Sequence, residues 1–312
     1  MTDMNKIIAV AGPTAAGKTK FAIRIANEFD GEIVSCDSMQ LYKFMDIGSA
    51  KPTPEEMKQA KHHLVDIIDP RDDFSVAEYQ KLAKAAISDI SSRGKLPVVS
   101  GGTGLYLNSL IYEMDFSAAP GDTEYRNRLM DMAEKQGSGA VHDMLKELDP
   151  QAASCIHPNN TKKIVRALER IREGEGRVRQ FRDISRKTSD YDVLLIGITR
   201  DREDLYDRIN RRVDVLVEQG LFEEVKGLMD MGLTPDNISM KGIGYKEVMQ
   251  YFAGAYSREE AIDTIKKNTR HYAKKQLTWF RRYDKMNWYN ISDFDSDEHA
   301  AEVIISWIQK SR

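Results

Sequence analysis

A glycine-rich loop near the amino terminus constrains the fold of this chain most. The stretch "AGPTAAGKTKFA", residues 11–22, carries Gly12, Gly17, Lys18 and Thr19 in the spacing G-x-x-x-x-G-K-[ST]. An apolar run precedes it and a segment with helical spacing follows it, which is the strand–loop–helix context of a phosphate loop. Backbone N–H groups and the positive end of the helix dipole would surround phosphate oxygens there. The pattern leaves open whether the ligand is a nucleotide or another diphosphate.

Short apolar strands alternate with helices along the chain. Strands are expected in "KIIAVAG", "GEIVSCDS", "KLPVVS" and "YDVLLIGITR", and helices over 18–29, 74–94, 205–220, 222–232, 245–254, 258–283 and 298–312. This alternation predicts an α/β fold with a P-loop NTPase-like parallel sheet and covering helices. Residues 117–189 are helical in pattern and poor in strands. We therefore expect a catalytic core of residues 1–116 and 190–312 and a helical insertion domain of residues 117–189.

Composition places the chain among soluble globular proteins. It has 41% hydrophobic and 30% charged residues in 312 positions, as ordinary folded domains do. No apolar run approaches the roughly 20 residues of a membrane span, and the amino terminus does not resemble a signal peptide. The two cysteines, Cys36 and Cys155, form no C-x-x-C pair. We therefore expect no disulfide framework, no association with a membrane, and a cytoplasmic location.

Positive charge gathers in two segments although the net charge is −3. Residues 160–187 hold ten Lys and Arg against four acidic residues, and residues 266–285 hold eight against Asp284 alone. In the second segment Lys267, Arg270, Lys274 and Lys285 fall on roughly one helical face together with Arg281. Such segments on a slightly acidic chain favour a polyanionic partner, although a single basic run is more often a solvated helix face.

Asp37 is the acidic residue expected to act at the carboxyl ends of the parallel strands, near the phosphate loop. It falls where the second strand should end, and side chains there open into the ligand crevice of a parallel sheet. An ordinary ATPase should have a strand that ends in an acidic residue supporting Mg²⁺. The third strand here runs into "SGGTGLY", which offers small residues and the Thr103 hydroxyl. From position alone, Asp37 could be a partner of Mg²⁺, a general base, or the cap of the next turn. The Thr19 hydroxyl is the expected metal ligand of the phosphate loop.

Motifs spread over nearly the whole chain resemble the bacterial tRNA dimethylallyltransferase family, also called tRNA isopentenyltransferases. They are "GPTAAGKT", "DSMQLYKFMDIGSAKPT", "HHLVDIIDP", "FSVAEYQ", "GGTGLY", "HPNN" with "RALE", "GIGYKE" and "AKKQLTWFRR", in this order. The family transfers a dimethylallyl group from dimethylallyl diphosphate to N6 of the adenosine 3′ of the anticodon, in tRNAs that read codons beginning with U. The resemblance therefore implies that the loop holds an isoprenoid diphosphate with Mg²⁺.

The resemblance implies roles for individual residues. It makes Asp37 the general base that takes the N6 proton, and it places Arg212 with Lys18 and Thr19 at the diphosphate. Arg208, one helical turn before Arg212, is a weaker candidate for the same role. The diphosphate-binding residues it implies are Gly12, Pro13, Thr14, Ala15, Ala16, Gly17, Lys18 and Thr19.

The resemblance also implies a tRNA-binding set and a flipped target base. The set is Asp37, Ser38, Met39, Gln40, Thr103, Arg126, Lys162, Lys163, Arg166, Lys241, Gly242, Ile243, Gly244, Tyr245, Lys246, Lys274, Lys275, Gln276, Trp279 and Arg281. Trp279 and Phe280 interleave with basic residues, as in single-strand binding surfaces, but Phe280 fits a core position better. His62 and His63 lack a recognised ligand spacing, which favours a structural role.

Other activities share parts of this pattern. A small-molecule P-loop kinase has the loop and the sheet, and an adenylate dimethylallyltransferase prenylates free nucleotides, but neither needs the helical insertion and the basic helix. A non-catalytic RNA-binding NTP switch would not need Thr19, Asp37 and Arg212 together. We expect a monomer that binds the tRNA anticodon stem-loop and dimethylallyl diphosphate.

Overall fold

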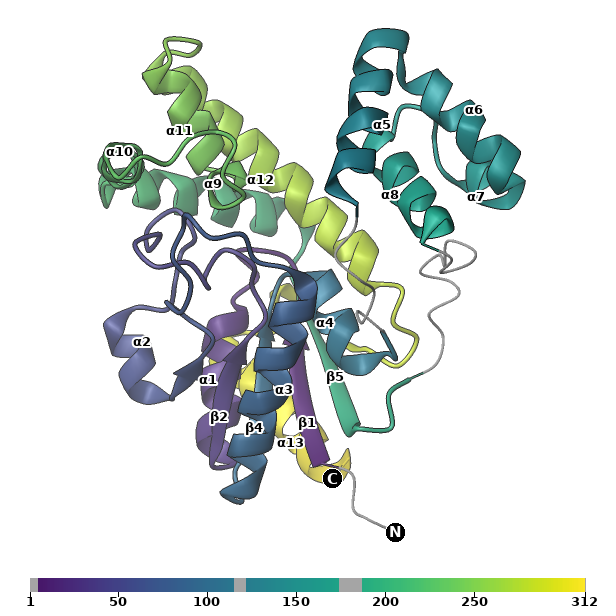
Figure 1. Cartoon of the computed structure of the whole chain (residues 1–312). Helices are drawn as coiled ribbons and strands as arrows, with labels where there is room; N and C mark the ends of the chain where they lie inside the picture. The colour runs from purple at the N-terminus through teal and green to yellow at the C-terminus, as the bar shows by residue number, and fades with distance from the viewer. Residues whose placement is uncertain (1–4, 115–121, 174–186, 312) are drawn as a thin grey trace. The chain divides into compact units, whose positions relative to one another are not determined.

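The computed structural model describes residues 5–114, 122–173 and 187–311 (Figure 1). The chain divides into two compact units, a core unit of residues 1–111 and 188–312 and an inserted unit of residues 112–187. The sequence pattern set these boundaries a few residues later, at 117 and 189. No helix among the described residues is both long and apolar enough to cross a membrane.

The core unit is built on a six-stranded, all-parallel sheet of order β3-β2-β4-β1-β5-β6. The strands are β1 (Asn5–Ala11), β2 (Gly31–Ser35), β3 (His62–His63), β4 (Leu96–Gly101), β5 (Tyr191–Thr199) and β6 (Asn287–Asn290). The four longer strands are those that the sequence predicts, and the P-loop α/β class is confirmed. The central strand β1 pairs with β4 on one side and β5 on the other, so the phosphate loop that follows β1 leaves the middle of the sheet.

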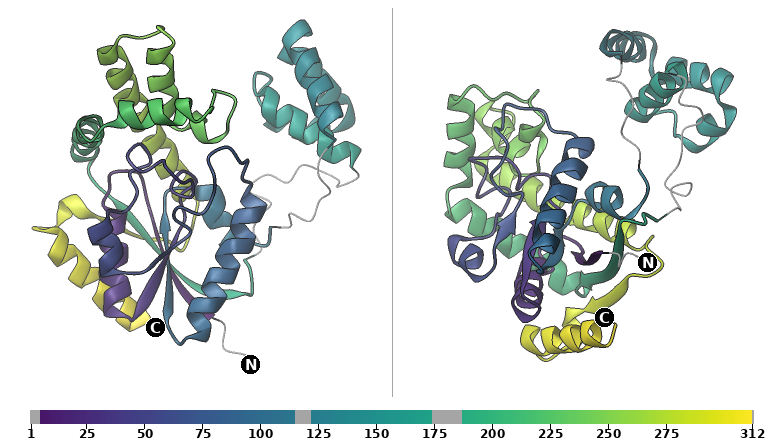
Figure 2. Two further views of the ribbon diagram at one scale, coloured as in Figure 1. Left: turned by 60° about the vertical axis from the view of Figure 1, so that its left-hand side comes forward. Right: turned by 60° about the horizontal axis from the view of Figure 1, so that its bottom comes forward.

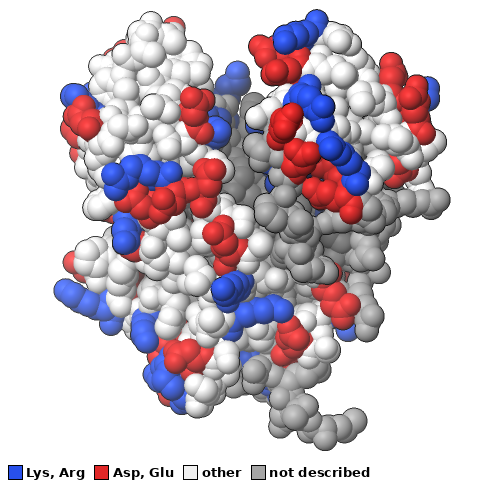
Figure 3. Space-filling view, in the orientation of Figure 1, with Lys and Arg blue, Asp and Glu red and all other residues white. Residues whose placement is uncertain are grey.

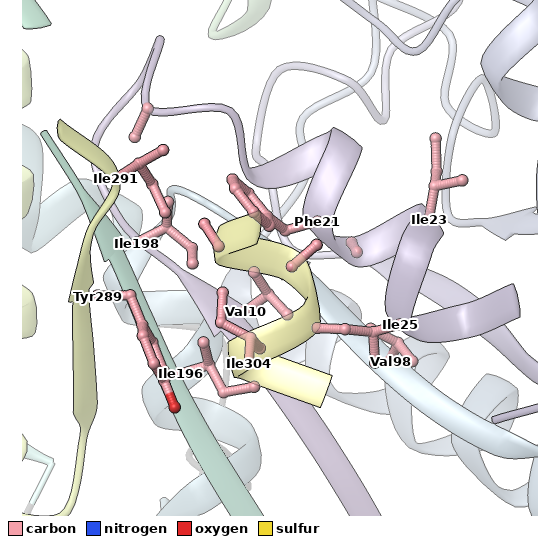
Figure 4. Close-up of a cluster of buried hydrophobic side chains, with 14 of the residues drawn as sticks. Val10, Phe21, Ile23, Ile25, Val98, Ile196, Ile198, Tyr289, Ile291 and Ile304 are labelled. Atoms are coloured by element: carbon pink, nitrogen blue, oxygen red, sulfur yellow. The ribbon is translucent and has the colours of Figure 1, made fainter. Parts of the chain in front are cut away.

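Helices cover both faces of this sheet. Figure 2 (left) shows α1 (Lys18–Glu28) and α13 (Asp297–Ser311) on one face and α3 (Val76–Ser92) on the other, where α4 (Gly104–Ile111) joins it. α3 begins where the sequence predicts a helix because Ser75 and Glu78 form a reciprocal capping box. Phe21, Ile25, Val98, Ile196 and Ile304 form the apolar layer between the sheet and the first pair of helices (Figure 4).

A second group of helices stands at the carboxyl ends of the strands (Figure 1). It comprises α9 (Arg202–Glu218), α10 (Leu221–Asp230), α11 (Tyr245–Phe252) and α12 (Arg258–Phe280), with the short η2 (Ser239–Lys241). Their core contains Leu221, Val248 and Ile265 and also takes in Tyr42 and Met45 from the segment after Asp37. The helical group therefore packs directly on the loop that carries the candidate base.

The inserted unit has its own hydrophobic core. Its helices are α5 (Thr123–Gln136), α6 (Ser138–Leu148), α7 (Pro150–Cys155) and α8 (Thr161–Arg172), and Leu129, Val141 and Leu168 are fully or almost fully buried between them. The chain enters and leaves the unit at neighbouring points, since Tyr112 bridges Lys187 and the Thr188 N–H donates to the Ile111 carbonyl (3.1 Å).

The structure departs from the sequence prediction at several elements. The strands β3 and β6 are two and four residues long, too short for a periodic signal. The helix α2 (Pro54–Gln59) was also not predicted, although Thr53 and Glu56 form a capping box around Pro54. The basic helix α12 ends at Phe280, so Arg281 caps it and Lys285 lies beyond its expected basic face.

Candidate active site

Three basic side chains, one from the phosphate loop itself and two from β5–α9, hold the carbonyls of the loop. The loop carbonyls of Pro13, Ala15 and Ala16 accept hydrogen bonds from Lys18 Nζ (2.8 Å), Arg208 Nε (3.0 Å) and Arg200 Nε (3.3 Å), respectively. Ala15 has a φ of 63°, a left-handed conformation that costs a non-glycine residue about 1–2 kcal/mol. The bond from Arg208 to its carbonyl fixes the loop in this strained shape.

The loop lies directly against the next strand of the sheet. A Cβ on Gly12 would collide with the Ile198 carbonyl oxygen of β5, so only glycine lets the chain pass there. Arg200, just after β5, bonds the loop and pairs with Asp204 (3.1 Å) and Asp297 (2.7 Å). Arg200 is therefore neutralised by its own partners and serves as a support of the loop.

Asp37 lies two residues beyond β2, beside the loop that follows β4. Its Oδ1 accepts the Met39 N–H (2.9 Å), so the turn-cap role left open by the sequence is met by one carboxylate oxygen. Thr103 joins the two loops, since its N–H donates to the Cys36 carbonyl (3.1 Å) and its Oγ1 accepts the Ser38 N–H (3.0 Å). The carboxylate is thus held in place while its second oxygen remains available for chemistry.

The electrostatics of this crevice favour an anion. Burial lowers the pKa of Lys18 to about 8, with Asp37 acting against that shift and Arg212 adding to it. Burial likewise lowers the pKa values of Arg208 and Arg212, and the Arg208 charge further lowers that of Arg212. Lys18 and Arg212 therefore both lie near the Asp37 carboxylate, with Glu56 also near Arg212, whereas the carboxylates near Arg208 are Asp204 and Asp297. Because burying excess charge is costly, the arrangement is suited to a ligand with several negative charges.

The sheet also contains a small polar cavity beneath the loop. It has a volume of about 20 Å³ and is lined by Thr19, Ser35, Gln40, His62 and Ser100, among others, with room for one water molecule. The Nε2 atom of His62 is buried and has no hydrogen-bond partner in the described part of the chain, while Nδ1 bonds the Ala60 carbonyl (2.8 Å). Since a carbonyl only accepts, Nδ1 carries the proton, and the neutral ring presents Nε2 as an acceptor.

The donor set decides how a metal ion could be held. Over residues 5–114, 122–173 and 187–311, no cluster of three or more His, Cys, Asp or Glu side chains is placed to hold a metal. His63 is occupied by a bond to Glu32 (2.7 Å), which gives it a structural role. The Thr19 hydroxyl fits a cation that takes most of its ligands from phosphate oxygens and water, as Mg²⁺ does in phosphate loops.

A larger hollow elsewhere in the core unit does not suit an anion. It measures about 490 Å³, and its lining includes Arg200 and the acidic residues Asp201, Glu203, Asp204, Asp295 and Asp297. Five carboxylates against one arginine, itself paired with two of them, make this surface negative. The diphosphate candidate therefore remains the crevice at Lys18 and Arg212.

Most of the predicted tRNA-binding cations of the core unit are exposed. Lys241, Lys246, Lys274, Lys275 and Arg281 all have exposed side chains. Arg270 is different, because its guanidinium bonds Asn210 (2.5 Å) on α9. On the face shown in Figure 3, basic and acidic side chains are interspersed and do not separate by sign, in keeping with the small net charge.

Two residues predicted to contact tRNA have buried side chains. Tyr245 is 0% exposed, and its hydroxyl donates to Glu224 (2.9 Å). Gln276 is 5% exposed, and its amide bonds two loops of the core unit. Both side chains thus make packing contacts and hydrogen bonds within the core unit, and their contact with tRNA stays a prediction. Phe280 is buried as expected.

In the inserted unit, Lys162, Lys163 and Arg166 are exposed on the first turns of α8. The guanidinium of Arg126 pairs with the buried Glu169 (2.7 Å), which gives it a structural role in addition to the predicted one. The expected basic residues Arg177, Arg179, Arg182 and Arg186 lie outside the described residues.

The structure adds residues that the sequence did not single out. Tyr272 lies on α12, where desolvation followed by the nearby Asp37 charge raises its pKa, while the Thr103 and Gln276 side chains lower it. Glu224 accepts the N–H groups of three consecutive residues, 46 to 48, at 2.7–2.9 Å. Only spatial contacts reveal these two, since each acts more than 150 positions away from its own place in the chain.

Comparison with known proteins agrees with the geometry. The family model described as IPP transferase matches residues 40–283. The chain belongs to the IPP transferase family. A tRNA dimethylallyltransferase of Alkaliphilus oremlandii is 52% identical over 300 residues, covering 96% of both chains. One from Clostridioides difficile is 46% identical over 305 residues, covering 98% of both.

Solved structures of IPP transferase relatives share the fold. The tRNA isopentenylpyrophosphate transferase of Bacillus halodurans matches with a TM-score of 0.74 and 44% identity, covering 98% of this chain and 96% of that one. A eukaryotic dimethylallyltransferase acting on tRNA matches with a TM-score of 0.82 and 27% identity, covering 98% of this chain and 80% of that one. The resemblance stated from the motifs is therefore confirmed at the level of family and fold.

Proposed function

We infer that the chain is a tRNA dimethylallyltransferase. It transfers the dimethylallyl group of dimethylallyl diphosphate to N6 of the adenosine adjacent to the anticodon on its 3′ side, in tRNAs that read codons beginning with U. The observation that carries the proposal is the crevice where Lys18 and Arg212 lie near the Asp37 carboxylate, beside the phosphate loop that Arg208 holds through the Ala15 carbonyl. Such a site can hold a diphosphate and take a proton within one small volume.

The donor half of the mechanism rests on charge. When the allylic C–O bond breaks, its electron pair leaves with the diphosphate, and negative charge grows on that leaving group. The loop N–H groups and the cations Lys18 and Arg212 already stand where that charge develops, and fixed donors of this kind stabilise a transition state most effectively. A divalent cation, which we propose to be Mg²⁺ held through Thr19, would neutralise further charge on the leaving group.

The acceptor half rests on Asp37. Adenine N6 is a weak nucleophile because its lone pair is delocalised into the ring, so it must lose a proton as the new C–N bond forms. The carboxylate of Asp37 takes that proton and later releases it to water. A positioned general base typically contributes about 10²–10⁴ in rate. The adenine base must leave its stack in the tRNA to reach Asp37. Ser38, Met39 and Gln40, which follow Asp37, would contact the flipped adenine.

The exposed cations supply the tRNA contacts in this proposal. Lys274, Lys275 and Arg281 on the core unit and Lys162, Lys163 and Arg166 on the inserted unit would bind phosphates of the anticodon stem-loop. Phosphate contacts give affinity and position, while the flipped base gives specificity. We propose that the chain works on tRNA as a monomer.

One incubation tests the function against its alternatives. The protein is mixed with dimethylallyl diphosphate, Mg²⁺ and unmodified tRNA, and the digested nucleosides are analysed by mass. An adenosine in which a dimethylallyl group replaces one hydrogen is expected only when tRNA is present. Product from adenosine monophosphate would favour an adenylate dimethylallyltransferase, and consumption of ATP with a small acceptor would favour a kinase.

A further inference from the structure

The side-chain amide of Gln276 bridges two loops that are far apart in the sequence. Its Oε1 accepts the Thr14 N–H of the phosphate loop (2.9 Å), and its Nε2 donates to the Gly102 carbonyl after β4 (2.9 Å). These partners lie 262 and 174 positions from it in the chain. Gln276 therefore joins the helix α12, the diphosphate loop and the loop next to Asp37 at one buried point.

The packing around this bridge leaves no room for a side chain at Gly102 or Gly104. A Cβ on Gly102 would collide with Nε2 of Gln276, and one on Gly104 would collide with the Trp279 ring. α12 thus lies as close to the glycine-rich loop as glycine allows. A residue at position 276 must offer a donor and an acceptor together, which an amide does and a lysine or an ionised glutamate does not.

The bridge continues to the candidate base. One helical turn before Gln276, Tyr272 lies near Asp37, Thr103 and Gln276, which all influence its pKa. Gln276 bonds the Gly102 carbonyl, and the next residue, Thr103, accepts the Ser38 N–H (3.0 Å), directly after Asp37. The bridge therefore connects Thr14, through α12 and the glycine-rich loop, to the residue beside Asp37.

The bridge also sets which loop groups face a ligand. The Thr14 N–H is directed to Gln276 and is not free for a phosphate oxygen. The next residue, Ala15, holds a left-handed φ of 63°. Gln276 fixes the Thr14 N–H just before this strained residue, and Arg208 fixes the Ala15 carbonyl just after it. Together these two hydrogen bonds determine the direction of the remaining loop amides.

We propose that Gln276 is a positioning residue that holds the diphosphate loop and the Asp37 loop at a fixed separation and makes no contact with tRNA. The inference rests on the proposed function and assigns this buried residue a role different from that of its exposed neighbours on α12. Donor and acceptor must approach within a few tenths of an ångström of the reactive geometry. Loss of the bridge would therefore weaken diphosphate binding and turnover while leaving the tRNA surface intact.

Three variants test the assignment. Gln276→Met removes both hydrogen bonds at similar size, Gln276→Asn keeps the amide but shortens its reach, and Lys275→Met is the matched control on the exposed side of the same helix. For each, the affinity for inorganic pyrophosphate, the affinity for a tRNA transcript without donor, and kcat are measured well below the unfolding midpoint. If the methionine variant does not fold, the asparagine variant carries the same test.

The expected pattern separates the two positions. At position 276 we expect pyrophosphate affinity to fall about tenfold and kcat about 10- to 100-fold, with tRNA affinity within about twofold, as for loss of buried hydrogen bonds. Lys275→Met should instead lower tRNA affinity and leave pyrophosphate affinity unchanged. Tyr272→Phe combined with Gln276→Met should be non-additive in pyrophosphate affinity, because the two side chains are neighbours one turn apart on α12.

Two results would overturn the inference. If the position-276 variants lose tRNA affinity and keep pyrophosphate affinity, the residue is a tRNA contact. If they lower only the unfolding temperature and leave both affinities and kcat unchanged, its role is confined to stability. Failure of the proposed function is a separate result, since it appears as an unmodified tRNA in the wild-type reaction, while both binding measurements remain interpretable.

Discussion

Asp37 and Lys18 divide the chemistry of the site between a proton and a leaving group. Asp37 has one oxygen in the turn at Met39 and lies close enough to oppose the lowered pKa of Lys18. The opposite charges are neighbours, yet the proposal gives them separate tasks. A substitution that removes charge at one of them without changing size can therefore tell the tasks apart.

We predict that Asp37→Asn lowers kcat and kcat/KM together by about 10²-fold or more, because a general base acts only in the transition state. Binding of dimethylallyl diphosphate should barely change, since Lys18, Thr19 and the loop amides remain. Titration with Mg²⁺ and direct binding measurements check this. A parallel shift in Mg²⁺ dependence and diphosphate affinity would assign Asp37 to the metal, and near-normal turnover would remove it from both roles.

The sequence could predict the residues whose roles follow from local motifs. Lys18, Thr19, Asp37 and Thr103 are where the strand–loop pattern and the family motifs put them. Tyr272 and the bridging role of Gln276 could not be predicted, because their partners come from loops more than 150 positions away. The exposure of a helical residue is likewise a property of what packs on it, so the burial of Tyr245 and Gln276 was not visible from their spacing.

At the scale of elements, two ionised side chains, those of Glu224 and Lys51, hold the segment after Asp37 in shape. Glu224 on α10 accepts three consecutive backbone N–H groups from residues 46–48. Lys51, whose side chain is only 4% exposed, bonds the Tyr42 carbonyl (2.6 Å) and pairs with Asp46 and Asp66. This segment has no regular secondary structure, so these side chains replace the hydrogen bonds of a helix or strand.

We predict that Glu224→Gln destabilises the core unit by about 1–3 kcal/mol, the usual cost of leaving buried partners of a charged group poorly paired. The KM for tRNA should rise as well, because the segment follows Ser38, Met39 and Gln40, which we propose to meet the flipped base. Thermal unfolding and steady-state kinetics measure both effects. Glu223→Gln changes the same residue type at the exposed neighbouring position and should alter neither; equal effects at the two positions would contradict the anchoring role.

A buried carboxylate also ties β2 to β3 and α3. Glu32 is 4% exposed. Its carboxylate accepts hydrogen bonds from Nη1 and Nη2 of Arg93 (2.5 and 2.7 Å) and is bonded to Nε2 of His63 (2.7 Å). The bonds to Arg93 are the main cause that holds the pKa of Glu32 well below its ordinary value of 4.5. A lowered folded-state pKa stabilises the protein above the unfolded-state pKa, and this contribution is lost as the pH falls.

We therefore predict a steeper loss of stability below about pH 4.5 in the wild type than in Glu32→Gln, which has no charge to lose at this position. The variant should be less stable near neutral pH, and the two curves should converge in acid. Chemical unfolding at a series of pH values gives the comparison. Glu28→Gln, at an exposed position of α1, should keep the wild-type slope, and a wild-type slope in Glu32→Gln would refute the argument.

The sequence predicted the elements that have a long periodic pattern of apolar residues. It did not predict the strands that are defined only by their pairing with a neighbouring strand. The strands β1, β2, β4 and β5 and all the long helices follow their apolar patterns closely. β6 is a strand only because residues 287–290 lie beside β5, and β3 only because two residues pair with β2. The capping box at Thr53 and Glu56 was a local signal for α2 that could have been used.

At the scale of the whole molecule, each unit contributes its own set of exposed cations. Lys162, Lys163 and Arg166 lie on the inserted unit, and Lys274, Lys275 and Arg281 on the core unit. The net charge of −3 means that binding of a polyanion must depend on these local sets and not on the overall charge. Local phosphate contacts release counterions in proportion to their number.

We predict that tRNA affinity falls steeply with salt concentration and that Lys274→Ala reduces the slope of log affinity against log salt by about one unit, as for one phosphate contact. Binding titrations at several salt concentrations measure the slope. Lys226→Ala is the matched control, because the Lys226 ammonium pairs with Asp230 within α10 (3.2 Å). An unchanged slope in Lys274→Ala, or an equal change in both variants, would place Lys274 on a solvated face.

The position of β5 next to β1 has a consequence for the order of folding during synthesis. The phosphate loop is made within the first 20 residues, yet Gly12 takes its shape against Ile198, and Ala16 is held by Arg200. The inserted unit, with a hydrophobic core of its own, is synthesised between these two partners. A nascent chain can therefore fold its helical insertion while the loop at its beginning still waits for β5. Sheets whose strands pair across such long stretches of sequence form late, so the phosphate loop acquires its working shape only after a much later segment has been synthesised.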